Sequence, residues 1–112
     1  MKTISAKELH ERIQEKEVMI LDVRAHEKYE QNNIAELNVH SINIPKTEIF
    51  QLEDESDTLA SLPKDREIIV TCTTGNSARK CATILADKEY QVTLLEGGIT
   101  AWDEYKNSHN ED

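Results

Sequence analysis

The chain is short of positive charge. Thirteen Lys and Arg residues stand against twenty-two Asp and Glu residues among 112, which gives a net charge of −9 and an isoelectric point near 4.9. Binding to nucleic acid or to an anionic membrane surface needs a basic face on the protein. We therefore expect neither nucleic acid nor a membrane among the partners of this protein.

Cysteine, glycine, proline and long apolar runs are also scarce. The two cysteines, Cys72 and Cys81, are too few for a disulfide scaffold and lack the spacing of a zinc site. Three Gly and two Pro residues form no linker. No apolar run approaches the roughly 20 residues of a membrane span, and the first residues lack the apolar stretch of a signal peptide. We expect one cytoplasmic domain over residues 1–106, with a frayed polar tail at 107–112.

Apolar segments of strand length alternate with helical patterns along the chain. Mostly apolar runs predict strands at residues 18–23, 41–44, 67–71 and 92–95. Helical spacing predicts helices at 6–15, 26–31, 77–88 and 99–105, the first with a capping box at Ser5 and Glu8. One or two short helices are expected within 46–65, around a solvated acidic loop at 53–57. This alternation indicates an α/β fold with a mainly parallel sheet.

The segment after the strand at 67–71 carries the candidate chemistry. Cys72 falls at the carboxyl end of a buried strand, where ligands bind in open α/β sheets. Small residues follow, and Gly75 and Asn76 tolerate the left-handed backbone that a nest of N–H groups needs. The helix that begins near Ser77 adds the positive end of its dipole. Both features favour a nucleophilic thiolate, whereas the alternative is a core cysteine that only ends a strand.

Three further motifs surround this loop in the sequence. They are Asp22-Val23-Arg24 followed by Glu27-Lys28-Tyr29, the segment Ile42–Pro45, and the terminal Leu95–Trp102 with its Gly97-Gly98 turn. With these motifs and the Cys72–Ser77 loop, the chain resembles the rhodanese family in its small single-domain form over about residues 3–106. The resemblance implies a sheet of about five strands that is flanked by helices on both faces.

The resemblance also implies an activity. Rhodaneses are sulfurtransferases, so Cys72 would take a sulfane sulfur from thiosulfate or a persulfide and pass it on as a persulfide. The partners would be a small-molecule donor and a thiol or cyanide-like acceptor, or a protein persulfide, with no cofactor and no metal. Asp22 and Arg24 would support the loop. The substrate-binding residues would be Thr73, Thr74, Gly75, Asn76, Ser77, Ala78 and Arg79.

The loop departs from the family pattern in its charge. Many members place Arg or Lys inside the loop, but here it is uncharged and Arg79 comes just after it. We therefore expect weak turnover of thiosulfate and favour a persulfide as the donor. The net charge of −9 points the same way, because thiosulfate is a dianion and a negative field slows its approach.

Three alternatives remain open at this point. A cysteine phosphatase would need an arginine after five intervening residues, whereas six separate Cys72 from Arg79 and Ala78 takes that position. Rhodanese-like domains also serve as non-catalytic binding or regulatory modules. Cys81, on the same helix face as Ser77, is either a core residue, which we favour, or a resolving thiol that attacks oxidised Cys72.

Overall fold

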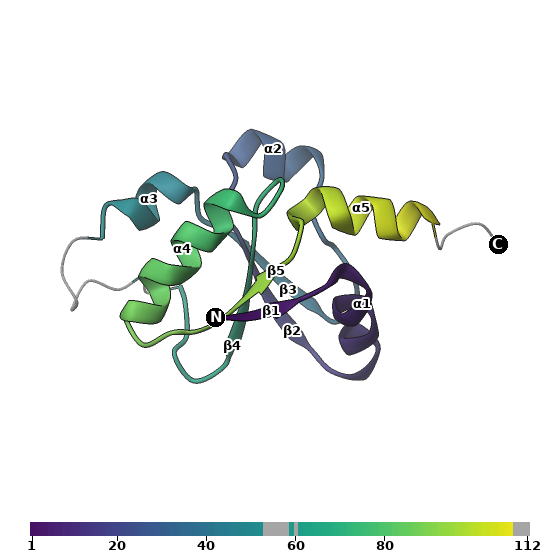
Figure 1. The fold of residues 1–112 in the computed structure, drawn as a ribbon, viewed down its shortest axis with the longest axis horizontal. Helices are drawn as coiled ribbons and strands as arrows, with labels where there is room; N and C mark the ends of the chain where they lie inside the picture. Colours follow the sequence, from purple (N-terminus) through teal and green to yellow (C-terminus); the bar gives the residue numbers. More distant parts are fainter. Residues whose placement is uncertain (53–58, 60, 109–112) are drawn as a thin grey trace.

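The computed structural model describes residues 1–52, 59 and 61–108, which form one parallel sheet with helices on both sides (Figure 1). The strands are β1 (Lys2–Ile4), β2 (Val18–Asp22), β3 (Val39–Asn43), β4 (Glu67–Thr71) and β5 (Gln91–Leu95). Their order in the sheet is β1-β5-β4-β2-β3, and every neighbouring pair is parallel. The helices are α1 (Ala6–Glu15), α2 (His26–Gln31), α3 (Lys46–Phe50), α4 (Asn76–Asp87) and α5 (Gly98–Ser108).

The sheet separates two apolar cores. Successive side chains of a strand point to opposite faces, so Ile68 and Val70 of β4 pack on one side while Ile69 packs on the other. The first core lies under α3 and α4, and the second lies under α1 and α5. Figure 1 shows these two helix pairs on opposite sides of the strands. The predicted α/β class, parallel sheet and two-sided helix cover are confirmed.

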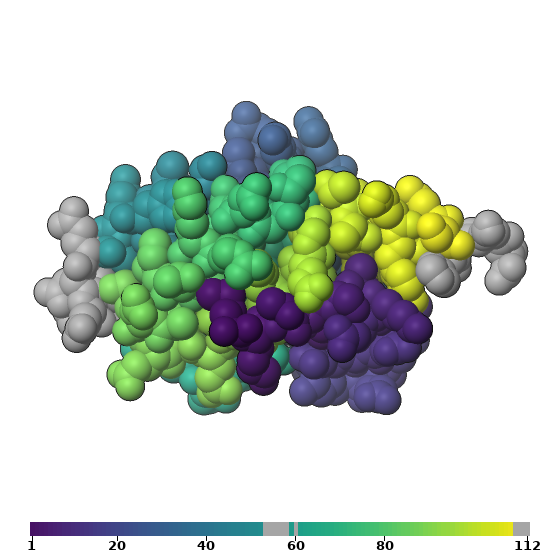
Figure 2. Space-filling model, viewed as in Figure 1, coloured from purple at the N-terminus to yellow at the C-terminus, as the bar shows by residue number. Residues whose placement is uncertain are grey.

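Helix α1 begins as the sequence predicts. The Ser5 hydroxyl accepts the Glu8 backbone N–H at 3.1 Å, and the Glu8 carboxylate accepts the Ser5 N–H at 2.9 Å. Strand β1, which directly precedes this cap, was not predicted, because only Ile4 of its three residues is buried. It pairs with β5 at the edge of the sheet. In Figure 2 these N-terminal residues, in the darkest purple, lie at the surface in the middle of the face shown.

Two predicted boundaries differ from the structure by two residues or more, and several others differ by one. Strand β3 begins at Val39, two residues before the predicted start. Helix α5 continues to Ser108, so the first two residues of the expected frayed tail are helical. Near this end of the helix, the Lys106 amino group lies 3.2 Å from the Glu36 carboxylate and 5.6 Å from the centre of the Trp102 ring. The acidic loop at 53–57 and the tail at 109–112 lie outside the described residues.

The carboxyl ends of the parallel strands bring three sequence motifs to one edge of the sheet. β4 lies between β2 and β5 in the sheet, so the segments that follow these three strands are neighbours. The last residue of β2 and the segments after the three strands contain Asp22–Arg24, Cys72–Ser77 and Gly97-Gly98. Within the described part of the chain, no helix is both long enough and apolar enough to span a bilayer.

Candidate functional site

The sulfur of Cys72 lies against the backbone at the start of α4. Cys72 follows β4 directly and is 5% exposed. Its Sγ accepts the N–H of Gly75 at 3.0 Å and the N–H of Ala78 at 3.3 Å. Gly75 caps the helix with φ of 106°, a left-handed conformation that a side chain would strain. Two backbone N–H groups and the N-terminus of α4 therefore direct their positive ends at the sulfur.

The loop is fixed from its other side by the start of α5. The N–H groups of Ile99 and Thr100 donate to the carbonyl oxygens of Cys72 and Thr73 at 2.8 and 3.0 Å. Gly98 permits this approach, with φ of 62° and no side chain, because a Cβ atom there would lie 2.3 Å from the Cys72 carbonyl oxygen. The first turn of α5 therefore holds the loop carbonyls, while the N–H groups of Gly75 and Ala78 bind the sulfur.

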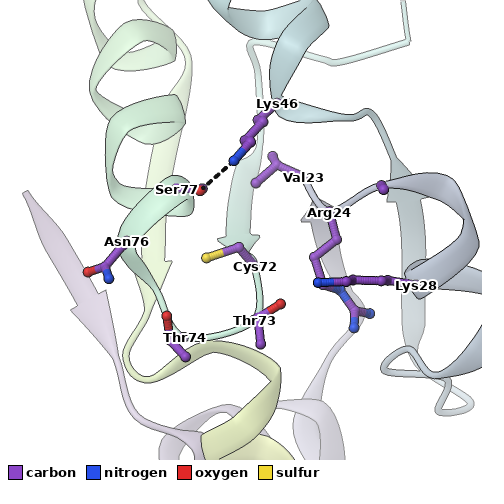
Figure 3. Close-up of a pocket in the computed structure, with 10 residues that line it drawn as sticks. Val23, Arg24, Lys28, Lys46, Cys72, Thr73, Thr74, Asn76 and Ser77 are labelled. Atoms are coloured by element: carbon purple, nitrogen blue, oxygen red, sulfur yellow. Dashed lines mark hydrogen bonds between the residues drawn. The ribbon is translucent and has the colours of Figure 1, made fainter.

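A pocket of about 360 Å³ opens above Cys72. Figure 3 shows its walls, which come from the segment after β2, from α2 and α3, and from the Cys72 loop. Four of the predicted substrate-binding residues line the pocket, while Gly75 and Ala78 donate their N–H groups to the Cys72 sulfur. The lining residues are Val23, Arg24, Ala25, Lys28, Lys46, Cys72, Thr73, Thr74, Asn76 and Ser77.

Asp22 and Arg24 form a buried ion pair beside this pocket. Their side chains are 2% and 8% exposed, and Arg24 Nη2 lies 2.8 Å from Asp22 Oδ2. The Arg24 backbone N–H and Nε also donate to Asp22 Oδ1 at 3.0 Å, and the guanidinium donates to the Asn32 carbonyl. Asn43 donates to the carbonyl oxygens of Asp22 and Arg24 at 3.0 and 2.9 Å. This network fixes the turn that forms one wall of the pocket.

Two lysines of the pocket were not predicted as site residues. Lys46 begins α3, where its backbone N–H donates to the Val23 carbonyl at 2.9 Å, and its Nζ lies 3.4 Å from Ser77 Oγ. Lys28 belongs to α2. Both are exposed, and both precede the Cys72 loop by more than 25 residues in the sequence. Nothing in the sequence pattern distinguishes them from other surface lysines.

Comparison with known proteins identifies the family. The sequence model of the Rhodanese-like domain matches residues 5–105. The chain belongs to the rhodanese family. The candidate sulfurtransferase YtwF of Bacillus subtilis is 25% identical to it over 104 residues, which cover 92% of this chain and 91% of YtwF.

Two solved structures extend the comparison. The Rhodanese-like domain protein from Staphylococcus aureus is 29% identical, with a TM-score of 0.77 over 91% of each chain. An NAD-dependent persulfide reductase from A. fulgidus is 30% identical, with a TM-score of 0.64 over 91% of this chain and 16% of that chain. The fold that the sequence resemblance implied is therefore confirmed.

Arg79 lies outside the pocket of this rhodanese-family protein. Its side chain is exposed and borders a separate depression with Phe50, Lys80, Thr83 and Ile84. The neighbouring Ala78 is fully buried and directs its N–H to the sulfur, so the next residue along the helix faces solvent. The prediction that Arg79 binds substrate has no support in this geometry. A phosphatase would need that guanidinium over the cysteine, so the geometry does not favour phosphate chemistry either.

Cys81 lies in the core between α4 and the sheet. It is fully buried among apolar residues. Burial raises the pKa of its thiol to about 12, and Cys72 adds to the rise while Lys46 opposes it. Attack on an oxidised sulfur requires a thiolate, and this thiol is protonated at neutral pH. The structure supports the core-packing interpretation of Cys81. Among the described residues, no cluster of His, Cys, Asp or Glu could hold a metal ion.

Proposed function

We propose that the protein is a sulfurtransferase that carries a sulfane sulfur as a persulfide on Cys72. The observation that carries the proposal is the Cys72 sulfur, which accepts two backbone N–H groups at the base of an open pocket. Membership of the rhodanese family and similarity to the candidate sulfurtransferase YtwF support it.

In the first half-reaction, the Cys72 thiolate attacks the sulfane sulfur of the donor. A bond forms between Sγ and that sulfur, and the bond from the sulfur to the leaving group breaks. The leaving group departs with the electron pair, as sulfite from thiosulfate or as a thiolate from a persulfide. The N–H groups of Gly75 and Ala78 stabilise the attacking anion, and backbone dipoles do this without a proton transfer.

In the second half-reaction, an acceptor removes the sulfur. A thiolate or cyanide attacks the outer sulfur of the persulfide, the bond to Sγ breaks, and Cys72 becomes a thiolate again. The same two N–H groups then stabilise the departing Sγ. The partial match to an NAD-dependent persulfide reductase supports a persulfide as one donor or product of this cycle.

Replacement of each cysteine in turn tests the proposal. We expect Cys72→Ser to abolish sulfur transfer from both thiosulfate and glutathione persulfide, because a hydroxyl forms no persulfide. Cys81→Ala is the matched control, since Cys81 is equally a free cysteine but lies in the core rather than in the pocket. Transfer that survives in Cys72→Ser would overturn the proposal. A wild-type protein that is inactive with both donors would point instead to a binding or regulatory module.

A further inference from the structure

A depression between α3 and α4 lies outside the Cys72 pocket. Its volume is about 560 Å³, and Phe50 and Ile84 form its apolar part. Phe50 is the single phenylalanine of the chain, and it is 42% exposed although phenylalanine is usually buried. Exposed apolar surface that is rimmed by polar residues is typical of interaction sites. We call this feature the α3–α4 depression, and its lining residues are Phe50, Arg79, Lys80, Thr83 and Ile84.

The charge at the α3–α4 depression is positive, in a chain whose net charge is −9. Arg79 and Lys80 are exposed, and neither forms an ion pair with any described residue. No lining residue is an Asp or a Glu. The Thr83 hydroxyl donates to the Arg79 carbonyl at 2.9 Å, so it is already satisfied within the helix. The surface therefore matches a partner that presents carboxylates beside a large apolar side chain.

The α3–α4 depression and the Cys72 pocket are built on the same two helices, which lie side by side in Figure 1. Lys46 of the pocket and Phe50 of the depression are four residues apart on α3, so they share a face of that helix. On α4, the pocket residue Ser77 and the depression residue Ile84 are seven residues apart, which share a face and correspond to about 10 Å along the axis. An extended chain spans this distance with about three residues.

We propose that the α3–α4 depression docks a protein whose cysteine accepts the sulfur of Cys72, through an acidic segment with a large apolar side chain about three residues from that cysteine. This inference rests on the proposed sulfur transfer. The apolar side chain of the partner packs on Phe50 and Ile84, and its carboxylates pair with Arg79 and Lys80. The cysteine of the same segment then reaches the Cys72 pocket.

The transfer to such a partner needs no further reactant. The partner's cysteine thiolate attacks the outer sulfur of the Cys72 persulfide, and a sulfur–sulfur bond forms on the partner. The bond from that sulfur to Cys72 Sγ breaks, and Sγ keeps the electron pair. The N–H groups of Gly75 and Ala78 then bind Sγ again. Docking on α3 and α4 contributes by holding the attacking thiolate close to the persulfide.

The test loads Cys72 with sulfur from thiosulfate or glutathione persulfide and follows its transfer to a synthetic peptide by mass spectrometry. The peptide has one cysteine, a leucine about three residues before or after it, and glutamates beside the leucine. The variants are Phe50→Ala and Lys80→Glu. Their matched controls are Leu37→Ala and Lys7→Glu, at an exposed leucine and an exposed lysine outside the depression. We expect the half-saturating peptide concentration to rise about fivefold in each variant and to stay within about twofold in the controls.

Changes in the peptide identify the contact that each variant removes. When alanine replaces the leucine of the peptide, Phe50→Ala should cause no further loss, because the two changes remove the same contact. When lysines replace the glutamates, Lys80→Glu should use the peptide better than the wild type does. The small neutral thiol β-mercaptoethanol cannot reach the α3–α4 depression. Its rate as an acceptor should therefore stay within about twofold of the wild-type value in every variant.

Three results overturn the inference. They are variants that use the acidic peptide as well as the wild type, an equal loss with β-mercaptoethanol, and a wild-type dimer in sedimentation analysis that Phe50→Ala dissociates, which assigns the depression to a second copy of the chain. Failure of the proposed function is recognised separately, as a wild type that forms no persulfide on Cys72 with either donor. Binding of a fluorescent peptide with serine in place of its cysteine then still tests the docking, with the same losses expected in Phe50→Ala and Lys80→Glu.

Discussion

The two ends of strand β4 hold charge in opposite ways. At its first residue, the Glu67 carboxylate accepts Arg12 Nη1 at 2.7 Å, receives the Thr93 hydroxyl, and lies 3.9 Å from Lys2 Nζ. Beyond its last residue, Lys28 and Lys46 border the Cys72 pocket without a carboxylate partner among the described residues. One end therefore consists of charges that compensate each other, and the other exposes charge of one sign.

This difference separates a structural role from a binding role. Paired charges connect elements, because Arg12 of α1 and Lys2 of β1 both reach the Glu67 side chain of β4. Unpaired cations stabilise the fold little, but they remain available to a ligand. Arg24 is instructive because it lines the pocket, yet its pairing with Asp22 places it with the structural charges.

The largest expected effect comes from Asp22→Asn. The substitution leaves the Arg24 guanidinium, whose side chain is 8% exposed, without its carboxylate. We expect the free energy of unfolding to fall by about 3 kcal/mol, as measured by urea denaturation. The control is Asp65→Asn at an exposed turn position, which should cost little. Equal stability of the two variants would mean that the pairing of Arg24 with Asp22 does not stabilise the fold.

The second largest effect is expected from Gly98→Ala, at the contact between α5 and the Cys72 loop. Gly98→Ala would place a methyl group 2.3 Å from the Cys72 carbonyl oxygen and 2.7 Å from that of Thr73. We expect a loss of about 2 kcal/mol in stability from this overlap and the left-handed backbone. Sulfur transfer should also fall, because the loop can no longer rest on α5.

Gly75→Ala serves as the comparison for Gly98. Its φ of 106° is also positive, but its nearest new contact would be an ordinary 3.6 Å. The unfolding free energy should therefore fall less than in Gly98→Ala. An equal or greater loss would show that backbone conformation, rather than close approach of α5, determines the cost.

Glu67→Gln tests the paired charges at the first residue of β4. Burial raises the pKa of Glu67, but the Thr93 hydrogen bond and the charges of Arg12 and Lys2 outweigh it, so the pKa is lowered overall. A carboxylate whose pKa is lowered by folding stabilises the fold at pH values above its ordinary pKa. That stabilisation is lost as the pH falls through the folded-state pKa. We expect Glu67→Gln to cost about 1 kcal/mol at pH 7, and we expect the difference from wild type to shrink as the pH falls below the ordinary value of about 4.3 and through the lower folded-state pKa.

The measurement for Glu67 is urea denaturation of both proteins across pH 3–7, with Glu11→Gln on the exposed face of α1 as the control. Persulfide formation on Cys72 should be unchanged in Glu67→Gln at neutral pH. A gap in stability that widens toward acid pH would contradict the assignment.

The smallest expected effect is that of salt on kcat/KM for thiosulfate. Two opposing fields act on this dianion, the net charge of −9 and the lysines at the pocket. Because the two lysines line the pocket, we expect kcat/KM for thiosulfate to fall about twofold as salt rises from about 0.05 to 0.5 M, with little change in a variant that carries both Lys28→Gln and Lys46→Gln. A rise with salt in the wild type would mean that long-range repulsion governs binding.

Much of the fold follows from local patterns in the sequence. The capping box at Ser5 fixes the start of α1, and the apolar run at 67–71 predicts β4 residue for residue. The nest around Cys72 was predictable as well, because Gly75 tolerates the left-handed backbone that the turn between a buried strand and a helix needs. Such features depend on neighbours within about six residues along the chain.

The features that escaped prediction depend on distant neighbours. Strand β1 is defined by its pairing with β5 rather than by its own three residues. The role of Gly98 follows from where α5 meets the Cys72 loop. Lys28 and Lys46 join the pocket only because α2 and α3 follow β2 and β3, whose carboxyl ends lie at the same edge of the sheet as that of β4. Arg79 shows the converse, since proximity in sequence to Cys72 did not place its side chain in the pocket.

The central claim is that Cys72 carries sulfur, and intact-protein mass spectrometry tests it most directly. After incubation with glutathione persulfide or thiosulfate, the wild-type protein should gain about 32 Da on Cys72, the mass of one sulfur atom, and cyanide should remove it. Cys72→Ser should gain nothing, whereas Cys81→Ala should behave as the wild type. A wild-type protein that stays unmodified with both donors, or a gain that persists in Cys72→Ser, would contradict the account.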